Sequence, residues 1–153
     1  MAPDEQPERV ERRGVVASRT DPRVNTLRVL FRHLHQFRSL FESEGICEIT
    51  APNGTIWSLL DIEYLYTAAM RRPTGVKEFD RAHPCLPLRQ QQAIELFLVL
   101  NKPEDKAAEI MGLSHTNPVG MYATSGLTKL LKLLDEGHLT RFAPDSVAMF
   151  AVA

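Results

Sequence analysis

Residues 86–134 read LPLRQQQAIELFLVLNKPEDKAAEIMGLSHTNPVGMYATSGLTKLLKLL and determine the fold that we predict for this chain. Pro87 and Pro103 each stand where a helix can begin, because a proline in the first turn loses no helical hydrogen bond. Gly112 supplies the conformational freedom of a turn after the second helix. Apolar residues then recur every three or four positions, at Val119, Ala123, Leu127, Leu130 and Leu134. This pattern predicts three helices, of which the last two form a helix-turn-helix.

The ends of the third helix carry sequence signals of their own. Asn117 is expected to be its N-cap and Pro118 its first residue. The helix should extend to about Glu136, where Gly137 provides a stop. On the second helix, the small side chain of Ala108 indicates that another helix crosses closely there. Residues 86–137 therefore form one predicted module.

Residues 25–45 predict a long amphipathic helix that ends at Gly45. Its apolar side chains follow steps of three and four residues: Leu27, Leu30, Phe31, Leu34, Phe37, Leu40 and Phe41. Arg28, Arg32 and Arg38 lie toward the opposite face. So wide an apolar stripe must pack against the rest of this chain or against a second copy.

A β-hairpin and a further helix are expected after this first helix. Asn53-Gly54 is a strong turn signal between short strand-like segments. Ser58 followed by Asp61 resembles a capping box at the start of the next helix. Proline and glycine then interrupt residues 73–85, which we interpret as a linker. The predicted fold is mainly α: residues 25–72 form a helix, a small β-hairpin and a helix, and the three-helix module follows.

The first 24 residues alternate in charge, contain three prolines and lack apolar periodicity, so they are predicted to be a disordered leader. The segment has five arginines that could contact phosphate: Arg9, Arg12, Arg13, Arg19 and Arg23. Five acidic residues in the same segment balance their charge. Residues 138–153 are predicted to be a tail, and its apolar end, FAPDSVAMFAVA, could be either a loose tail or a docking segment.

The overall composition is that of a globular protein, with 44% hydrophobic and 24% charged residues and a net charge of −1. This balance gives no general attraction to nucleic acid or to anionic membranes. No apolar run approaches the roughly 20 residues of a membrane helix, and no secretory signal is visible. Two cysteines do not make a disulfide framework, which favours a reducing cytoplasm.

No pattern in the sequence indicates catalysis, a metal site or a cofactor. There is no glycine-rich phosphate loop, nucleophile elbow or HExxH pair. Asp61 and Glu63 are two residues apart on a predicted helix, so they do not share a face. His83 and Cys85 lack the spacing of a zinc knuckle. We therefore expect a protein that is not an enzyme.

The predicted module resembles a known family. LPLRQQQAIEL, then KAAEIMGLS and a helix with Val119, Leu127 and Leu130, resembles region 4 of bacterial sigma-70-type factors, over about a third of the chain. In that family a Leu-Pro-x-Arg-Gln signature and an Ala-Glu-Ile-Leu-Gly-like turn precede the recognition helix. TNPVGMYATSGLTKLL is also similar to small sigma-like helix-turn-helix proteins of actinobacteria and their phages. The resemblance implies a DNA-binding transcription regulator that can also contact RNA polymerase. Residues 1–85 do not resemble the promoter-gripping region of complete sigma factors.

In a helix-turn-helix, exposed residues near the start of the second helix contact bases. Here the spacing selects five candidates for base contacts: Asn117, Met121, Thr124, Ser125 and Thr128. The polar members can hydrogen-bond base edges, and methionine can contact a thymine methyl. The candidates for phosphate contacts are Lys129, Lys132, Arg89 and Lys106. Gly120 is the remaining position that the spacing places on the exposed side of this helix.

The charge of the module limits this hypothesis. Six acidic residues outnumber five basic residues across 86–137, whereas the sigma family usually has Arg or Lys at several recognition positions. Because phosphate neutralisation supplies most non-specific DNA affinity, we expect binding to need a dimer, a basic arm or RNA polymerase as a partner. The alternative is a protein-interaction module that has this fold and does not bind DNA by itself.

Overall fold

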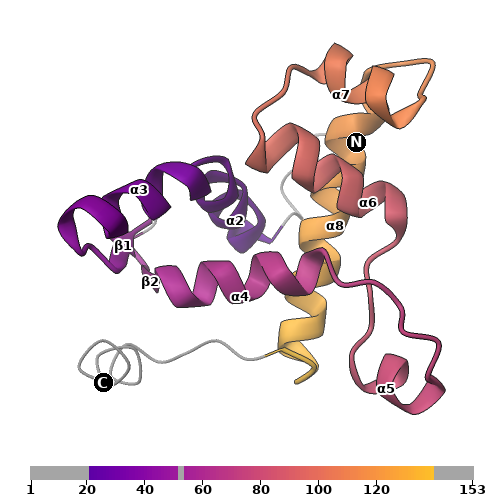
Figure 1. Cartoon of the computed structure of the whole chain (residues 1–153). Coiled ribbons are helices and arrows are strands. Elements are labelled where there is room, and N and C mark those ends of the chain that lie inside the picture. The colour runs from indigo at the N-terminus through magenta and orange to yellow at the C-terminus, as the bar shows by residue number, and fades with distance from the viewer. Residues whose placement is uncertain (1–20, 52–53, 140–153) are drawn as a thin grey trace, which may run out of the picture.

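The computed structural model describes residues 21–51 and 54–139. In chain order its elements are α2 (Pro22–Arg32), α3 (Leu34–Glu44), β1 (Glu48–Thr50), β2 (Ile56–Ser58), α4 (Leu59–Ala69), α5 (Lys77–Ala82), α6 (Leu88–Ala93), η2 (Ile94–Val99), α7 (Glu104–Met111) and α8 (Asn117–Asp135). Figure 1 shows helices throughout, with one small hairpin between α3 and α4. The mainly α fold with a β-hairpin that we predicted is confirmed.

The predicted first helix is two helices, so this expectation was wrong. α2 begins at Pro22, inside the range that we assigned to the leader, because the Asp21 carboxylate accepts the backbone N–H of Arg23 at 2.9 Å and caps the helix. His33, with φ −109° and ψ 15°, departs from helical geometry and separates α2 from α3. The two helices consequently run in different directions (Figure 1). Gly45 ends α3 in the left-handed conformation, as expected.

The hairpin pairs β1 with β2 in antiparallel register, with Ile49 opposite Trp57. The predicted turn residue Asn53 lies outside the described residues. The Ser58 hydroxyl oxygen accepts the backbone N–H of Asp61 at 2.9 Å, so the side-chain cap predicted for α4 is present. The segment predicted as a linker, 73–85, contains the short helix α5.

The three-helix module forms with small departures from its predicted boundaries. α6 continues directly into the π-helical segment η2. Gly112 ends α7 with φ 73°, which is the left-handed turn that the sequence indicated. α8 begins one residue earlier than expected, because Thr116 occupies the N-cap position and Asn117 is the first residue of the helix. Asn117 is therefore not the cap that we predicted.

Among residues 21–51 and 54–139, one hydrophobic core joins the two halves of the chain. α8 lies at its centre and contacts α2, α4, α6, η2 and α7. The fully buried side chains come from both halves, with Leu27, Phe31 and Ile62 before the linker and Ile94 and Leu127 after it. The predicted boundary between residues 25–72 and 86–137 does not separate two cores.

Candidate nucleic-acid interface

α8 has one buried and one exposed face. Its buried residues include Val119, Ala123, Gly126, Leu127 and Leu130. Along the opposite side run five exposed residues, which we call the α8 stripe: Asn117, Met121, Ser125, Thr128 and Lys132. Their spacing of three and four residues places them on one side of the helix, and Met121 is 69% exposed. Four of the five candidates for base contacts therefore lie together in solvent.

Thr124, the fifth candidate, is half-buried beside the stripe and is already engaged. Nη2 of Arg28, on α2, donates a hydrogen bond of 2.6 Å to its hydroxyl oxygen. The hydroxyl of Thr128 donates to the backbone carbonyl of Thr124 at 2.8 Å. Because the hydroxyl of Thr124 accepts in its bond with Arg28, it can still donate a hydrogen bond to a further partner. The hydroxyl of Thr128 already donates its hydrogen, so it can only accept a further bond.

Arg28 brings a positive charge to the edge of the α8 stripe. Its Nη1 also donates to the side-chain oxygen of Asn25 at 2.9 Å. Both partners are neutral, and Arg28 has no carboxylate partner within 21–51 and 54–139. Burial and, after it, the nearby charge of Arg32 lower the pKa of Arg28, but a guanidinium keeps its proton in proteins. An uncompensated cation therefore lies beside the predicted recognition residues.

The other arginines of the predicted first helix do not reach this face. Arg32 lies over the ring of Phe97, with its Cζ 4.5 Å from the ring centroid. Arg38 pairs with Glu63 of α4, with Nη2 2.7 Å from Oε1. The break at His33 separates Arg38, on α3, from α2, whereas Arg32 belongs to α2 and is held over Phe97.

The candidates for phosphate contacts divide into two pairs. Lys129 and Lys132 lie one turn apart on α8, where Lys132 is exposed and Lys129 half-buried. Arg89 instead donates to the carbonyl of Met111 in the last turn of α7, so it positions the helix that precedes the turn. Lys106 is exposed on α7, with its Nζ 3.7 Å from Oε1 of Glu109. Of these four candidates, Lys132 belongs to the α8 stripe and Lys129 lies beside it on the same helix.

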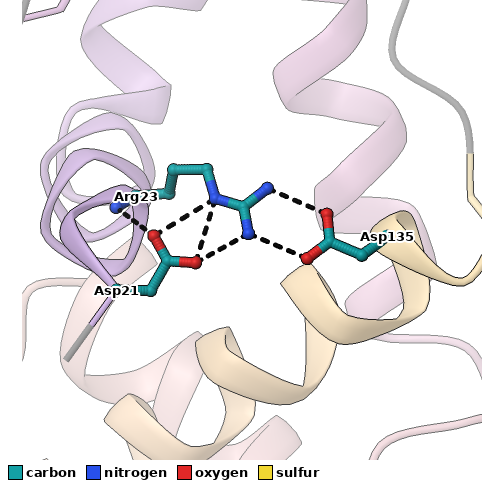
Figure 2. A network of polar contacts seen from close by, with 3 residues as sticks. All are labelled: Asp21, Arg23 and Asp135. Carbon is teal, nitrogen blue, oxygen red and sulfur yellow. Dashed lines mark hydrogen bonds and ion pairs between the residues drawn. The ribbon is translucent and has the colours of Figure 1, made fainter. Parts of the chain in front are cut away.

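Acidic groups lie at both ends of α8. Near its start, a Cβ on Gly120 would be 3.7 Å from Oε2 of Glu104. At its end, Asp135 accepts two hydrogen bonds from Arg23, at 2.9 and 2.8 Å, and Asp21 holds the same guanidinium (Figure 2). The bonds from Arg23 are the main cause that lowers the pKa of both carboxyl groups. Arg23 is thus already paired, which removes one of the five leader arginines that we considered for phosphate.

An apolar groove of about 300 Å³ lies between the end of α4, α6, η2 and α7. Its lining includes Met70, Leu88, Leu96 and Ile110, with Arg72 and Glu95 as charged members. Leu88 and Ile110 are more than half exposed. The sequence pattern did not identify this groove, because its walls come from helices separated by the linker.

The described residues contain no group of three or more side chains suited to hold a metal ion. Cys47 and Cys85 are free thiols. Within the described part of the chain, no helix has both the length and the apolar character needed to cross a membrane. Comparisons of the chain with protein-family models, with curated proteins and with solved structures gave no match.

One pH effect follows from a contact between the two halves of the chain. The hydroxyl of Tyr66 on α4 donates to the carboxylate of Glu95 on η2. Burial, then this hydrogen bond, raises the pKa of Tyr66 from 10.0 to about 12. Because the folded state holds this proton more tightly, the resulting stability is complete below about pH 10 and is lost as the pH rises toward about 12.

We therefore expect the free energy of unfolding of the wild-type protein to fall more steeply between about pH 10 and about pH 12 than that of a Tyr66→Phe variant. Urea unfolding at a series of pH values would measure both curves. Parallel curves over this range would contradict the role of Tyr66.

Proposed function

We propose that this protein is a transcription regulator that binds double-stranded DNA through the α8 stripe. The observation that supports the proposal is the separation of the two faces of α8. One face is buried in the core, and the other presents Asn117, Met121, Ser125 and Thr128 to solvent, after a turn at Gly112. A helix of this kind can enter the major groove, where hydroxyl and amide groups can bond base edges.

Arg28 adds a positive charge to a module in which acidic residues outnumber basic residues, the imbalance that limited the DNA-binding hypothesis. With Lys129 and Lys132 it gives three cations on or beside α8. Each phosphate that a protein neutralises makes the plot of log affinity against log salt steeper by about 0.9. Three such contacts would account for a slope of up to about −2.7, which is measurable although modest for a DNA-binding protein.

The test is a binding series with fluorescent duplexes of mixed sequence, at salt concentrations from about 50 to about 200 mM. The variant Arg28→Gln/Lys129→Gln/Lys132→Gln should bind more weakly, with a slope less steep by up to about 2.7. Its matched control is Arg72→Gln/Lys77→Gln/Arg81→Gln, which removes three exposed positive charges elsewhere in the chain. Equal losses in both variants, or no binding by the wild-type protein at the lowest salt, would refute the proposal.

The groove between α4, α6 and α7 favours a second function, as a protein-interaction module. Its exposed Leu88 and Ile110 suit an apolar partner surface. RNA polymerase, implied by the resemblance of the module, and a second copy of the chain are the partners to test. Retention of purified bacterial RNA polymerase, or a dimer in sedimentation, that is lost in Ile110→Glu would support this function. If Ile110→Glu changes neither measurement, the groove has no such role.

A further inference from the structure

Two arginines of α2 are held by neutral groups alone. Arg28 donates from Nη2 to the hydroxyl of Thr124 at 2.6 Å. Arg32 lies over the ring of Phe97, and its Nη1 donates to the side-chain oxygen of Asn101 at 3.4 Å. Neither guanidinium has a carboxylate partner within 21–51 and 54–139. Both positive charges are therefore uncompensated in the described part of the chain.

The neighbouring arginines of α2 and α3 differ in this respect, because carboxylates hold both of them. Arg23 bonds Asp21 and Asp135 (Figure 2). Arg38 bonds Glu63 with Nε and Nη2. The fold thus supplies counterions to the arginines on either side of Arg28 and Arg32 along the chain. It supplies none to these two, whose counterion would have to be a bound anion.

The two uncompensated charges are close together. Arg32 follows Arg28 by four residues on α2, so the two side chains share one side of the helix and start about 5.4 Å apart along its axis. The charge of Arg32 is, after burial, the second cause that lowers the pKa of Arg28. Like charges at this spacing destabilise a helix. An anion that contacts both guanidinium groups would remove this repulsion.

Arg32 is ordered by contacts at its backbone and at its guanidinium. Nδ2 of Asn101 donates to the backbone carbonyl of Arg32 at 2.8 Å, while Oδ1 accepts from the guanidinium. Asn101 does this at φ 53°, a backbone conformation that residues other than glycine seldom adopt. The ring of Phe97 supports the guanidinium, with 4.5 Å between Cζ and the ring centroid. Because the side chain is already ordered, a ligand would lose little binding energy in fixing it.

We infer that Arg28 and Arg32 form a phosphate site for the DNA backbone, on α2 beside the α8 stripe. The inference rests on the proposed function and gives it a phosphate contact, Arg32, that lies outside α8. Arg28 adjoins the stripe through Thr124, and Arg32 is one turn further along α2. A DNA strand that borders the groove occupied by α8 can therefore contact both arginines. Guanidinium groups suit phosphate because they bond its oxygens in pairs, and such contacts position a protein without reading sequence.

Arg32→Gln tests this site, because the proposed function makes no use of Arg32. In the same salt series with duplex DNA, the slope should become less steep by about 0.9, and affinity at about 100 mM salt should fall on the order of fivefold. The matched control is Arg81→Gln, which removes one exposed arginine on α5 and should change neither quantity. Far-ultraviolet circular dichroism of both variants should match that of the wild-type protein.

Asn101→Gly tests whether Asn101 positions Arg32. Glycine adopts φ 53° readily, so the backbone is kept while both bonds to Arg32 are lost. Affinity should fall about twofold to tenfold, because Arg32 must then be ordered on binding. The slope should not change, since the charge remains. In the Arg32→Gln background the same substitution should have no effect on affinity. An equal loss in both backgrounds would show that Asn101 does not act through Arg32.

The outcomes separate the phosphate site from the proposed function. If the wild-type protein binds DNA and Arg32→Gln binds equally well with the same slope, the phosphate site is overturned and binding through α8 stands. If Arg32→Gln and Arg81→Gln lose affinity equally, the effect is one of net charge, and the site is again overturned. If the wild-type protein binds no DNA at any salt concentration, both proposals fail.

Discussion

Phe31→Ala should lower the free energy of unfolding by about 3–5 kcal/mol, because truncation of a buried phenylalanine loses transfer free energy and leaves a cavity. Phe31 is fully buried on α2, and its ring meets that of Tyr66 edge-on, with the centroids 6.3 Å apart. α2 also contacts η2 and α8. The cavity would open where the first helices meet the helix-turn-helix, so the loss should affect the whole chain. This loss is a large fraction of the roughly 5–15 kcal/mol that is the free energy of unfolding of a typical domain.

Two spectroscopic probes in a urea titration would measure the loss of stability and show whether both halves of the chain unfold together. Trp57, the one tryptophan, reports on β2 by fluorescence, and far-ultraviolet circular dichroism reports on all helices. The two transitions should coincide in the wild-type protein and in the variant, because one core serves both halves. Phe41→Ala is the matched control, since Phe41 is 50% exposed on α3, and it should change stability by about 0.5 kcal/mol or less. Separate transitions for the two probes would contradict a shared core.

Sequence periodicity predicted the helices that bury one face, and it missed α5, which has no buried residue. The same periodicity missed the break at His33, since the apolar steps continue through it from Leu30 to Leu34 and Phe37. The structure suggests what holds that break in place. Asn101, with φ 53°, donates from its side chain to the carbonyl of Arg32 at the end of α2, at 2.8 Å. This contact joins residues 69 positions apart, and no local pattern can reveal it.

The candidate site was predictable to the extent that it depends on one helix. A period of 3.6 residues places Asn117, Met121, Ser125 and Thr128 on one face, and the structure has them there. The contribution of Arg28 depends on how α2 packs against α8, so its partner could not be identified from spacing. For Arg89 the sequence suggested a role that the structure does not favour. A basic residue next to a predicted helix-turn-helix is an obvious candidate for a phosphate contact. Its guanidinium instead bonds the end of α7.

Gly126→Leu should destabilise the protein by about 3 kcal/mol, at the upper end of the cost of overpacking a core. Gly126 is buried where α8 crosses α6 and η2. A Cβ at this position would lie 2.7 Å from Cδ1 of Ile94 and 3.2 Å from Cβ of Gln90. Ile94 is fully buried and Cβ of Gln90 is fixed to its backbone, so the helices would have to move apart. The sequence analysis predicted a close crossing at Ala108, which is buried on α7; Gly126 is a further tight position that it did not identify.

Gly120, on the same helix, provides the matched comparison. A Cβ there would meet only Oε2 of Glu104, at 3.7 Å, which is ordinary contact. Gly120→Ala should therefore stabilise the protein by up to about 1 kcal/mol, the gain in helix propensity from glycine to alanine. Gly126→Ala has the same gain, but the contacts with Ile94 and Gln90 should cancel it or reverse its sign. Urea unfolding of the three variants measures all of these differences. If Gly126→Ala stabilises the protein as much as Gly120→Ala does, the crossing has room for a side chain, and the placement of α6 against α8 would have to be revised.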